Sequence, residues 1–199
     1  MFIAFEGIDG AGKSTVSVMV KHALEKKGHN VFLTREPTDR IEWTDSLKKG
    51  RDAIAGLSLF FRFTEDRFRH QNEIREHLDA GEIVLCDRYI MSSLAYQGAL
   101  IEGLFDSRQR TVEWMLQVSS IILQRPQLTF YIDLDPAISI KRLRSRSELT
   151  GFEEVKYLDL VREFYNYIEL EGKIKINGSG TVEETYGTIM EEIEKRLKP

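Results

Sequence analysis

The sequence predicts an α/β fold in which a five-stranded parallel sheet is flanked by helices on both faces. Strand-like and helix-like stretches alternate along the 199 residues, which is the pattern that builds a parallel sheet. Most strand-like stretches are short apolar runs without in–out alternation, as expected where helices cover both faces. A glycine-rich stretch directly follows the first apolar run, and such stretches between a strand and a helix suit phosphate binding.

Each element is bounded by a change of pattern or by a turn residue. The expected strands are 2–6, 30–34, 83–87, 128–134 and 173–177, and the expected helices are about 12–27, 52–80, 107–124, 136–146, 152–170 and 182–198. Gly28 and Gly81 follow helices, and Pro136 begins one, which are the usual places for these residues. No stretch resembles a linker or a repeat, so we expect a single domain over residues 1–199 with right-handed crossovers.

Composition excludes several classes of protein. Apolar residues make up 42% and charged residues 30% of the chain, which is typical of a globular protein. The net charge of −4 argues against a nucleic-acid partner. A single cysteine, Cys86, excludes an internal disulfide framework and fits a reducing compartment. We see no apolar stretch of membrane-spanning length and no secretory signal, and therefore expect a cytoplasmic protein without a membrane partner.

Residues 7–15 read Gly-Ile-Asp-Gly-Ala-Gly-Lys-Ser-Thr and match the phosphate-binding pattern G-x-x-x-x-G-K-[ST]. Glycines let backbone N–H groups approach phosphate oxygens, and the helix that follows adds its positive N-terminal end. Lys13 is expected to reach the terminal phosphates, and Ser14 is expected to bind Mg²⁺. The predicted binding site for a nucleoside triphosphate comprises Gly7, Ile8, Asp9, Gly10, Ala11, Gly12, Lys13, Ser14 and Thr15.

Charged residues follow the second and third strands. In a parallel sheet the ligand lies outside the carboxyl ends of the strands, where Arg35, Asp87 and Arg88 are expected. Asp87 is placed to approach Mg²⁺, usually through water, and two guanidinium groups suit a phosphate dianion. Each residue alone is more simply explained by a strand-end salt bridge, but the three together beside a phosphate loop indicate function.

A second basic cluster lies at residues 141–148, where Arg142, Arg144 and Arg146 alternate with other residues. A solvated basic helix end, favoured by the helix dipole, explains this spacing from composition alone. Beside a phosphate loop, an arginine-rich lid is the alternative, because phosphoryl transfer requires positive charge on the migrating group and exclusion of water.

Four stretches in series, 2–15, 34–37, 87–89 and 92–98, resemble those of the thymidylate kinase family in order and approximate spacing. The resemblance implies a P-loop nucleoside monophosphate kinase fold with a short lid at about 142–152. It further implies transfer of the γ-phosphoryl of ATP to dTMP, giving dTDP, with Mg²⁺ as cofactor. It also implies a homodimer formed through the long second helix and its neighbours.

The resemblance assigns roles on the acceptor side. Asp9 would accept a hydrogen bond from the sugar 3′-hydroxyl, and Arg35 and Arg88 would hold the acceptor phosphate. Tyr96 would crowd the sugar 2′ position and favour deoxyribose, and Ser92 is counted with the substrate-binding residues.

The same resemblance assigns the base pocket. Phe63 would stack on thymine, Arg67 would donate to its O4, and Gln97 would read the N3 edge. A simpler explanation of Phe63 is core packing, because residues 57–61 are apolar; the spacing of Phe63 and Arg67 favours stacking, a common way to hold a base.

The lid has two versions in this family, distinguished by one position of the phosphate loop. Members with arginine there supply the catalytic cation from the loop, whereas members with glycine supply it from the lid. Gly10 identifies the lid-arginine type, with Arg146 as the first catalytic candidate and Arg144 as the second, and with Arg142 and Arg144 near ATP. The chain departs from the bacterial pattern at Thr38 and Asp39, where two glycines are usual.

Two other functions stay open from the sequence. One is phosphorylation of another nucleoside monophosphate, such as dUMP, which only the base-pocket residues argue against. The other is an ATP-dependent switch without an acceptor, against which the chain lacks a guanine-specifying Asn-Lys-x-Asp sequence.

Overall fold

The predicted five-stranded parallel sheet is confirmed in the computed structural model, which describes residues 1–38, 52–144 and 152–197. The strands are β1 (Phe2–Glu6), β2 (Val31–Arg35), β3 (Ile83–Asp87), β4 (Leu128–Asp133) and β5 (Lys173–Asn177). Their order across the sheet is β2-β3-β1-β4-β5, and every neighbouring pair is parallel. The central strand β1 is buried along its whole length, which explains its apolar run without alternation.

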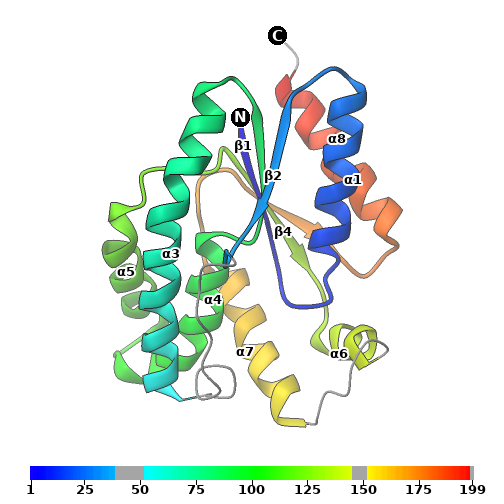
Figure 1. Cartoon of the computed structure of the whole chain (residues 1–199). Coiled ribbons are helices and arrows are strands. Elements are labelled where there is room, and N and C mark those ends of the chain that lie inside the picture. The colour runs from blue at the N-terminus through cyan, green and yellow to red at the C-terminus, as the bar shows by residue number, and fades with distance from the viewer. Residues whose placement is uncertain (39–51, 145–151, 198–199) are drawn as a thin grey trace.

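Helices cover the sheet on both sides (Figure 1). Helices α1 (Lys13–Lys26) and α8 (Val182–Leu197) lie together on one side. The other side carries α3 (Ala53–Asp79), α4 (Ile90–Ile101), α5 (Arg108–Val118) and α7 (Phe152–Tyr167), and α4 packs against α3, α5 and α7. Helix α6 (Pro136–Arg144) follows β4, and two short 3₁₀ helices, η1 (Glu102–Leu104) and η2 (Ser119–Ile121), flank α5.

The structure corrects several predicted elements. Helix α4 was not predicted, because most of its residues are buried and its sequence lacks the one-sided apolar stripe that indicates a helix. The strand expected at 30–34 is shifted by one residue, and the helix expected at 107–124 ends at Val118 and continues as η2. The helix expected to reach 170 ends at Tyr167, where Lys173 Nζ donates to the carbonyl oxygens of Tyr165 and Ile168.

The sheet brings three loops to one edge, because parallel strands end on the same side. The phosphate loop follows β1, residues 36–38 follow β2, and residues 88–89 follow β3. Strand β1 lies between β3 and β4, so the phosphate loop is central. Within the described residues, no helix is both long and apolar enough to cross a bilayer.

Candidate active site

The phosphate loop is shaped by two glycines and by its first helical turn. A Cβ atom on Gly7 would lie 2.5 Å from the Ile132 carbonyl oxygen, so only glycine fits between β1 and β4. Gly12 adopts a left-handed conformation (φ 93°) and begins α1, and no side chain of the described residues caps this helix. The first N–H groups of α1 are therefore available to bind an anion. Ile8 and Ala11 are buried and fix the loop to the core.

Lys13 is a buried cation with an unusual pKa. Its Nζ atom donates to the Ile8 carbonyl oxygen over 2.9 Å, and the residue is 5% exposed. Burial and the neighbouring charge of Arg88 lower the pKa of Lys13 from 10.5 to about 8, although Asp9 and Asp87 act in the opposite direction. A bound phosphate would favour the charged form of Lys13.

Ser14 and Asp87 form an oxygen-rich pair at the foot of the loop. The Ser14 hydroxyl donates to Asp87 Oδ2, while Asp87 Oδ1 is buried and has no hydrogen-bond partner among the described residues. Hydroxyl and carboxylate oxygens are the ligands that Mg²⁺ prefers, and this ion usually keeps waters and phosphate oxygens as its other ligands. The pair therefore fits Mg²⁺, even though no group of three or more His, Cys, Asp or Glu side chains in the described residues could hold a metal.

Two hollows open side by side at this edge of the sheet. The larger has a volume of about 780 Å³ and is lined by the phosphate loop with Arg35, Arg142 and residues 180–182. The smaller has a volume of about 270 Å³ and a mostly apolar wall. Both hollows are lined by the residues Asp9, Glu36, Pro37 and Arg88. The site therefore has a phosphate part and a smaller part suited to an organic group.

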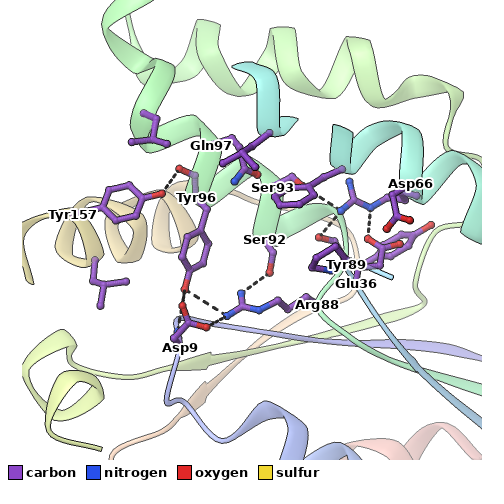
Figure 2. Close-up of a pocket in the computed structure, with 16 residues that line it drawn as sticks. Asp9, Glu36, Asp66, Arg88, Tyr89, Ser92, Ser93, Tyr96, Gln97 and Tyr157 are labelled. Atoms are coloured by element: carbon purple, nitrogen blue, oxygen red, sulfur yellow. Dashed lines mark hydrogen bonds and ion pairs between the residues drawn. The ribbon is translucent and has the colours of Figure 1, made fainter. Parts of the chain in front are cut away.

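Arg88 and Asp9 meet at the junction of the two hollows (Figure 2). Arg88 Nη2 lies 2.6 Å from Asp9 Oδ1, and Arg88 Nη1 donates to the Gly7 carbonyl oxygen and to Ser92 Oγ. The Tyr96 hydroxyl donates to Asp9 Oδ2 over 3.1 Å and accepts from the Asp9 backbone N–H over 3.0 Å. Burial in the cleft opposes ionisation of Asp9, but Arg88 and Lys13 prevail and lower its pKa from 3.8 to about 2. Asp9 is thus a fixed anion beside two cations.

The buried carboxylate of Glu6 binds residues that surround this junction. Glu6 accepts hydrogen bonds from the Tyr89 backbone N–H and from the hydroxyls of Ser92 and Tyr165. Burial raises the pKa of Glu6 even though these donors and Arg88 lower it. Because the Ser92 hydroxyl contacts both Glu6 and Arg88, it braces the guanidinium as well as lining the smaller hollow.

The smaller hollow contains one orphan donor and one orphan acceptor. Arg67 Nη1 and Gln97 Oε1 are buried without a hydrogen-bond partner among the described residues, although most buried polar atoms have one. Phe63 and Tyr157 line the same hollow. An aromatic wall with one donor and one acceptor suits a planar heterocycle whose edge carries a carbonyl and an N–H group.

The structure describes the three arginines of the predicted lid to different extents. Arg142 donates from Nη1 to the Gly10 carbonyl oxygen over 3.2 Å and from Nη2 to the carbonyl oxygens of Gly178 and Gly180. It therefore ties the phosphate loop to the loop after β5. Arg144 ends α6, and Arg146 lies outside the described residues.

The remaining predicted residues each line at least one of the two hollows. Thr15 and Arg35 line the larger one, Tyr96 lines the smaller one, and Arg88 lines both. Arg35 is the last residue of β2 and is paired in register with Asp87 of β3, which brings these two predicted residues to the same edge.

Several residues of the smaller hollow were not predicted. Glu36 stood inside a motif that pointed only to its neighbour Arg35, and Tyr157 reads as one more apolar position of α7. Asp66 accepts from the backbone N–H and the hydroxyl of Thr38, so the threonine that departs from the bacterial pattern has its own partner on α3. No local signal in the sequence identifies these three residues, because segments that are distant in the chain bring them to the hollow.

Comparisons with known proteins agree with this geometry. A model of the thymidylate kinase family matches residues 5–189. A probable thymidylate kinase of Thermoplasma acidophilum is 38% identical over 199 residues, covering 100% of this chain and 98% of the relative. Its counterpart in Thermoplasma volcanium is 41% identical over 180 residues, covering 90% of each chain. That of Picrophilus torridus is 41% identical, covering 88% of this chain and 84% of the relative. Since the family match spans nearly the whole chain, the protein belongs to the thymidylate kinase family.

Proposed function

We infer that this protein transfers the γ-phosphoryl group of ATP to dTMP, giving ADP and dTDP. The observation that carries this function is the pair of orphan atoms in the smaller hollow. Arg67 Nη1 can donate to O4 of thymine, and Gln97 Oε1 can accept from its N3–H, which satisfies both atoms at once. Phe63 in the same hollow would stack on the base, as aromatic side chains commonly do.

The larger hollow would hold the triphosphate of ATP. Backbone N–H groups of the loop and the start of α1 face its phosphates, and Lys13 neutralises the terminal ones. Bound at Ser14 and Asp87, Mg²⁺ would neutralise charge that develops on the phosphate oxygens. The larger hollow and the family membership support this assignment of ATP and Mg²⁺.

The acceptor phosphate would lie where the two hollows meet. Arg88 is fixed there by Asp9, by Ser92 and by the Gly7 carbonyl oxygen, and Arg35 lines the larger hollow. Two arginines can orient a phosphate dianion toward the γ-phosphorus of ATP, and such positioning supplies much of the rate of phosphoryl transfer. Asp9 would bind the sugar 3′-hydroxyl, and Tyr96 would occupy space near its 2′ position.

The remaining cation would come from a lid at about residues 142–152 of this single domain. Gly10 of the phosphate loop has φ 76°, and a Cβ atom there would lie 3.1 Å from the Ser139 carbonyl oxygen. A long side chain is disfavoured at this position, so the loop supplies no arginine. Arg146, with Arg144 as second candidate, would meet the charge of the transition state instead. Replacing Arg146 with alanine should lower kcat far more than it weakens dTMP binding.

Acceptor-dependent ADP release tests the function. The purified protein is given Mg²⁺ and ATP with dTMP, dUMP, dCMP, dGMP or no acceptor. Rapid release with dTMP alone supports the proposal, and equal turnover with dUMP would assign a broader acceptor range. Release that does not depend on an acceptor would identify an ATPase or switch and overturn the proposal.

An exposed apolar stripe on α3 supports a homodimer. Ile54, Phe61 and Phe68 are seven residues apart and are 78%, 51% and 48% exposed, so they share one face of the helix. Large apolar side chains that repeat along one exposed face of a helix favour an interaction site there.

The stripe continues onto the segment that begins in η2. Ile121 and Leu123 are also exposed, and Gln71 of α3 joins their backbone by donating to the Ile121 carbonyl oxygen and accepting from the Leu123 N–H. A two-fold contact would cover this apolar face with its own copy.

We also propose a cytoplasmic location, which the single buried cysteine Cys86 supports, because a reducing compartment keeps such thiols free.

Analytical ultracentrifugation tests the dimer. Combining Phe61→Glu with Phe68→Glu should convert a dimer into a monomer, because charge cannot be buried in an apolar contact. Leu104→Glu alters an equally exposed leucine on η1 and serves as control. A wild-type protein that sediments as a monomer would refute the homodimer without affecting the assignment of the reaction.

A further inference from the structure

We propose that His70 is a positioning residue that sets the acceptor specificity of the site by holding Glu36, and through it Arg67, in place. This inference rests on the proposed recognition of a 4-carbonyl base by Arg67. It concerns a buried side chain that lines neither hollow and would otherwise be an ordinary core histidine.

His70 is completely buried and both of its ring nitrogens have partners. Nδ1 lies 3.0 Å from Glu36 Oε1, and Nε2 lies 2.8 Å from Thr34 Oγ1. A carboxylate paired with arginine only accepts hydrogen bonds, so Nδ1 carries the proton. The imidazole therefore joins the end of β2 to the carboxylate with a defined orientation.

Glu36 divides its two oxygens between two residues of α3. While Oε1 accepts from His70, Oε2 accepts from Arg67 Nε over 2.6 Å. Glu36 and Arg67 are 5% and 2% exposed, so water does not compensate for a lost partner. Removing the histidine would leave one carboxylate oxygen unpaired in a buried site, and the carboxylate would be free to rotate away from the guanidinium.

The guanidinium of Arg67 is thereby fixed on two of its three nitrogens. Nε is held by Glu36, and Nη2 donates to the Tyr89 carbonyl oxygen and to Ser93 Oγ, each over 3.2 Å. Because a guanidinium is planar, fixing two nitrogens fixes the direction of the third. The third is Nη1, the orphan donor of a residue that lines the smaller hollow.

The spacing along both elements makes this arrangement possible. Arg67 and His70 are three residues apart on α3 and therefore share one face of the helix. Thr34 and Glu36 are two residues apart at the end of β2 and point to the same side, whereas Arg35 between them points to the other. The end of β2 therefore brings Arg35 to the larger hollow and also carries Thr34 and Glu36, which hold His70 and Arg67 in place.

Specificity follows from the fixed donor. A carbonyl at position 4 of the pyrimidine accepts the Nη1 hydrogen bond, whereas the 4-amino group of cytosine would place a donor against a donor. A buried mismatch of this kind discriminates strongly only while the donor cannot turn away. Removing the hydrogen bonds of His70 should therefore weaken the binding of thymine and reduce the preference of the site for thymine over cytosine.

Steady-state kinetics with dTMP, dUMP and dCMP test the role of His70. His70→Leu removes both hydrogen bonds, and we expect KM for dTMP to rise about tenfold, as for loss of a hydrogen bond to a charged group. The ratio of kcat/KM for dTMP over dCMP should fall by about the same factor, since the loss occurs only with a 4-carbonyl acceptor. The ratio of dTMP over dUMP and the KM for ATP should stay unchanged.

Three further variants separate positioning from folding. His70→Gln keeps a donor toward Glu36 and should restore most of the selectivity. Thr34→Val removes only the hydrogen bond between Thr34 Oγ1 and His70 Nε2, with little change of shape. It should change the same kinetic ratios in the same direction, and it provides the test if His70→Leu does not fold. His77→Leu breaks a similar pair on the same helix, with Glu82, away from either hollow, and should leave all the kinetic ratios unchanged.

Two results would overturn the proposal. A dTMP over dCMP ratio unchanged in both His70→Leu and Thr34→Val would refute it, as would an equal loss with dTMP, dCMP and ATP, which marks a purely structural residue. Failure of the wild-type protein to phosphorylate dTMP would instead refute the proposed function on which the inference rests.

Discussion

Arg88 Nη2 lies 2.6 Å from Asp9 Oδ1, so that a residue following β3 holds a residue of the phosphate loop at the junction of the two hollows. Asp9 contacts the Tyr96 hydroxyl as well. The carboxylate thereby connects the loop that would bind ATP to two residues of the acceptor side, and the charges of Arg88 and Lys13 keep its pKa below the ordinary value.

Replacing Asp9 with asparagine tests this relationship. The change keeps the size of the side chain but removes the charge that holds Arg88, so kcat/KM for dTMP should fall about tenfold or more, as for loss of a charge-assisted hydrogen bond. Glu65→Gln breaks an exposed pair with Arg69 on α3 and should leave the value unchanged. Equal values for Asp9→Asn and wild type would contradict a role for this pair.

The low pKa of Lys13 predicts a pH dependence. Since its pKa is about 8 in the protein, Lys13 loses its charge above that pH, and kcat/KM for ATP should decline there. At saturating ATP the bound phosphates favour the charged lysine, so kcat should hold to higher pH. A kcat/KM for ATP that stays constant from pH 7 to pH 10 would exclude this assignment.

The same shift predicts a change of stability with pH. The unfolded chain keeps the Lys13 proton up to its ordinary pKa of 10.5, whereas the folded chain releases it near 8. Lys13 therefore makes the free energy of unfolding rise with pH between these two values. Urea denaturation of wild type and Lys13→Met across this range measures the contribution as the difference in slope, and identical slopes would argue against it.

Asp87→Asn should raise the Mg²⁺ concentration needed for half-maximal turnover by about tenfold, because the carboxylate near the ion is lost. Chelation of Mg²⁺ should abolish turnover in both proteins. Asp79→Asn, at the end of α3, provides a control carboxylate outside both hollows. An unchanged Mg²⁺ requirement in Asp87→Asn would remove this residue from the metal site.

Two substitutions of Tyr96 separate its ring from its hydroxyl. Tyr96→Phe keeps the ring and should retain the preference for deoxyribose, while losing the hydrogen bonds to Asp9. Tyr96→Ala opens the space near the sugar and should raise turnover of the ribose form of TMP relative to dTMP. Parallel assays with both acceptors check this, and a preference that survives Tyr96→Ala would assign the discrimination to another residue.

Close packing of α4 on α7 predicts an effect on stability. A Cβ atom on Gly98 would lie 2.7 Å from the ring of Phe164, so Gly98→Ala should destabilise the fold by about 1–3 kcal/mol. Gly187 is also helical but has nothing within 4 Å of such an atom. Gly187→Ala should stabilise by about 0.5–1 kcal/mol. Thermal unfolding of both variants tests these two predictions. Destabilisation by Gly187→Ala as well would contradict the prediction that open space at that position makes alanine favourable.

Local signals in the sequence predicted much of the fold and part of the site. The strand-like stretches, most of them apolar runs, identified all five strands, and the phosphate loop was recognised from residues 7–15 alone. Such signals succeed because near neighbours in the chain determine them. Helix α4 was not predicted, because a helix that is buried on most sides shows no periodic contrast between apolar and polar residues.

The sequence by itself determined the parallel sheet, the phosphate loop and the residues that follow each strand. Only the tertiary structure decided that Glu36 pairs with both Arg67 and His70, that Asp66 holds Thr38, and that Arg67 Nη1 is buried without a hydrogen-bond partner among the described residues. The physical reason is distance along the chain. Hydrogen-bond partners 28 to 34 residues apart depend on how α3 lies across the end of β2, and no pattern within either segment specifies that arrangement.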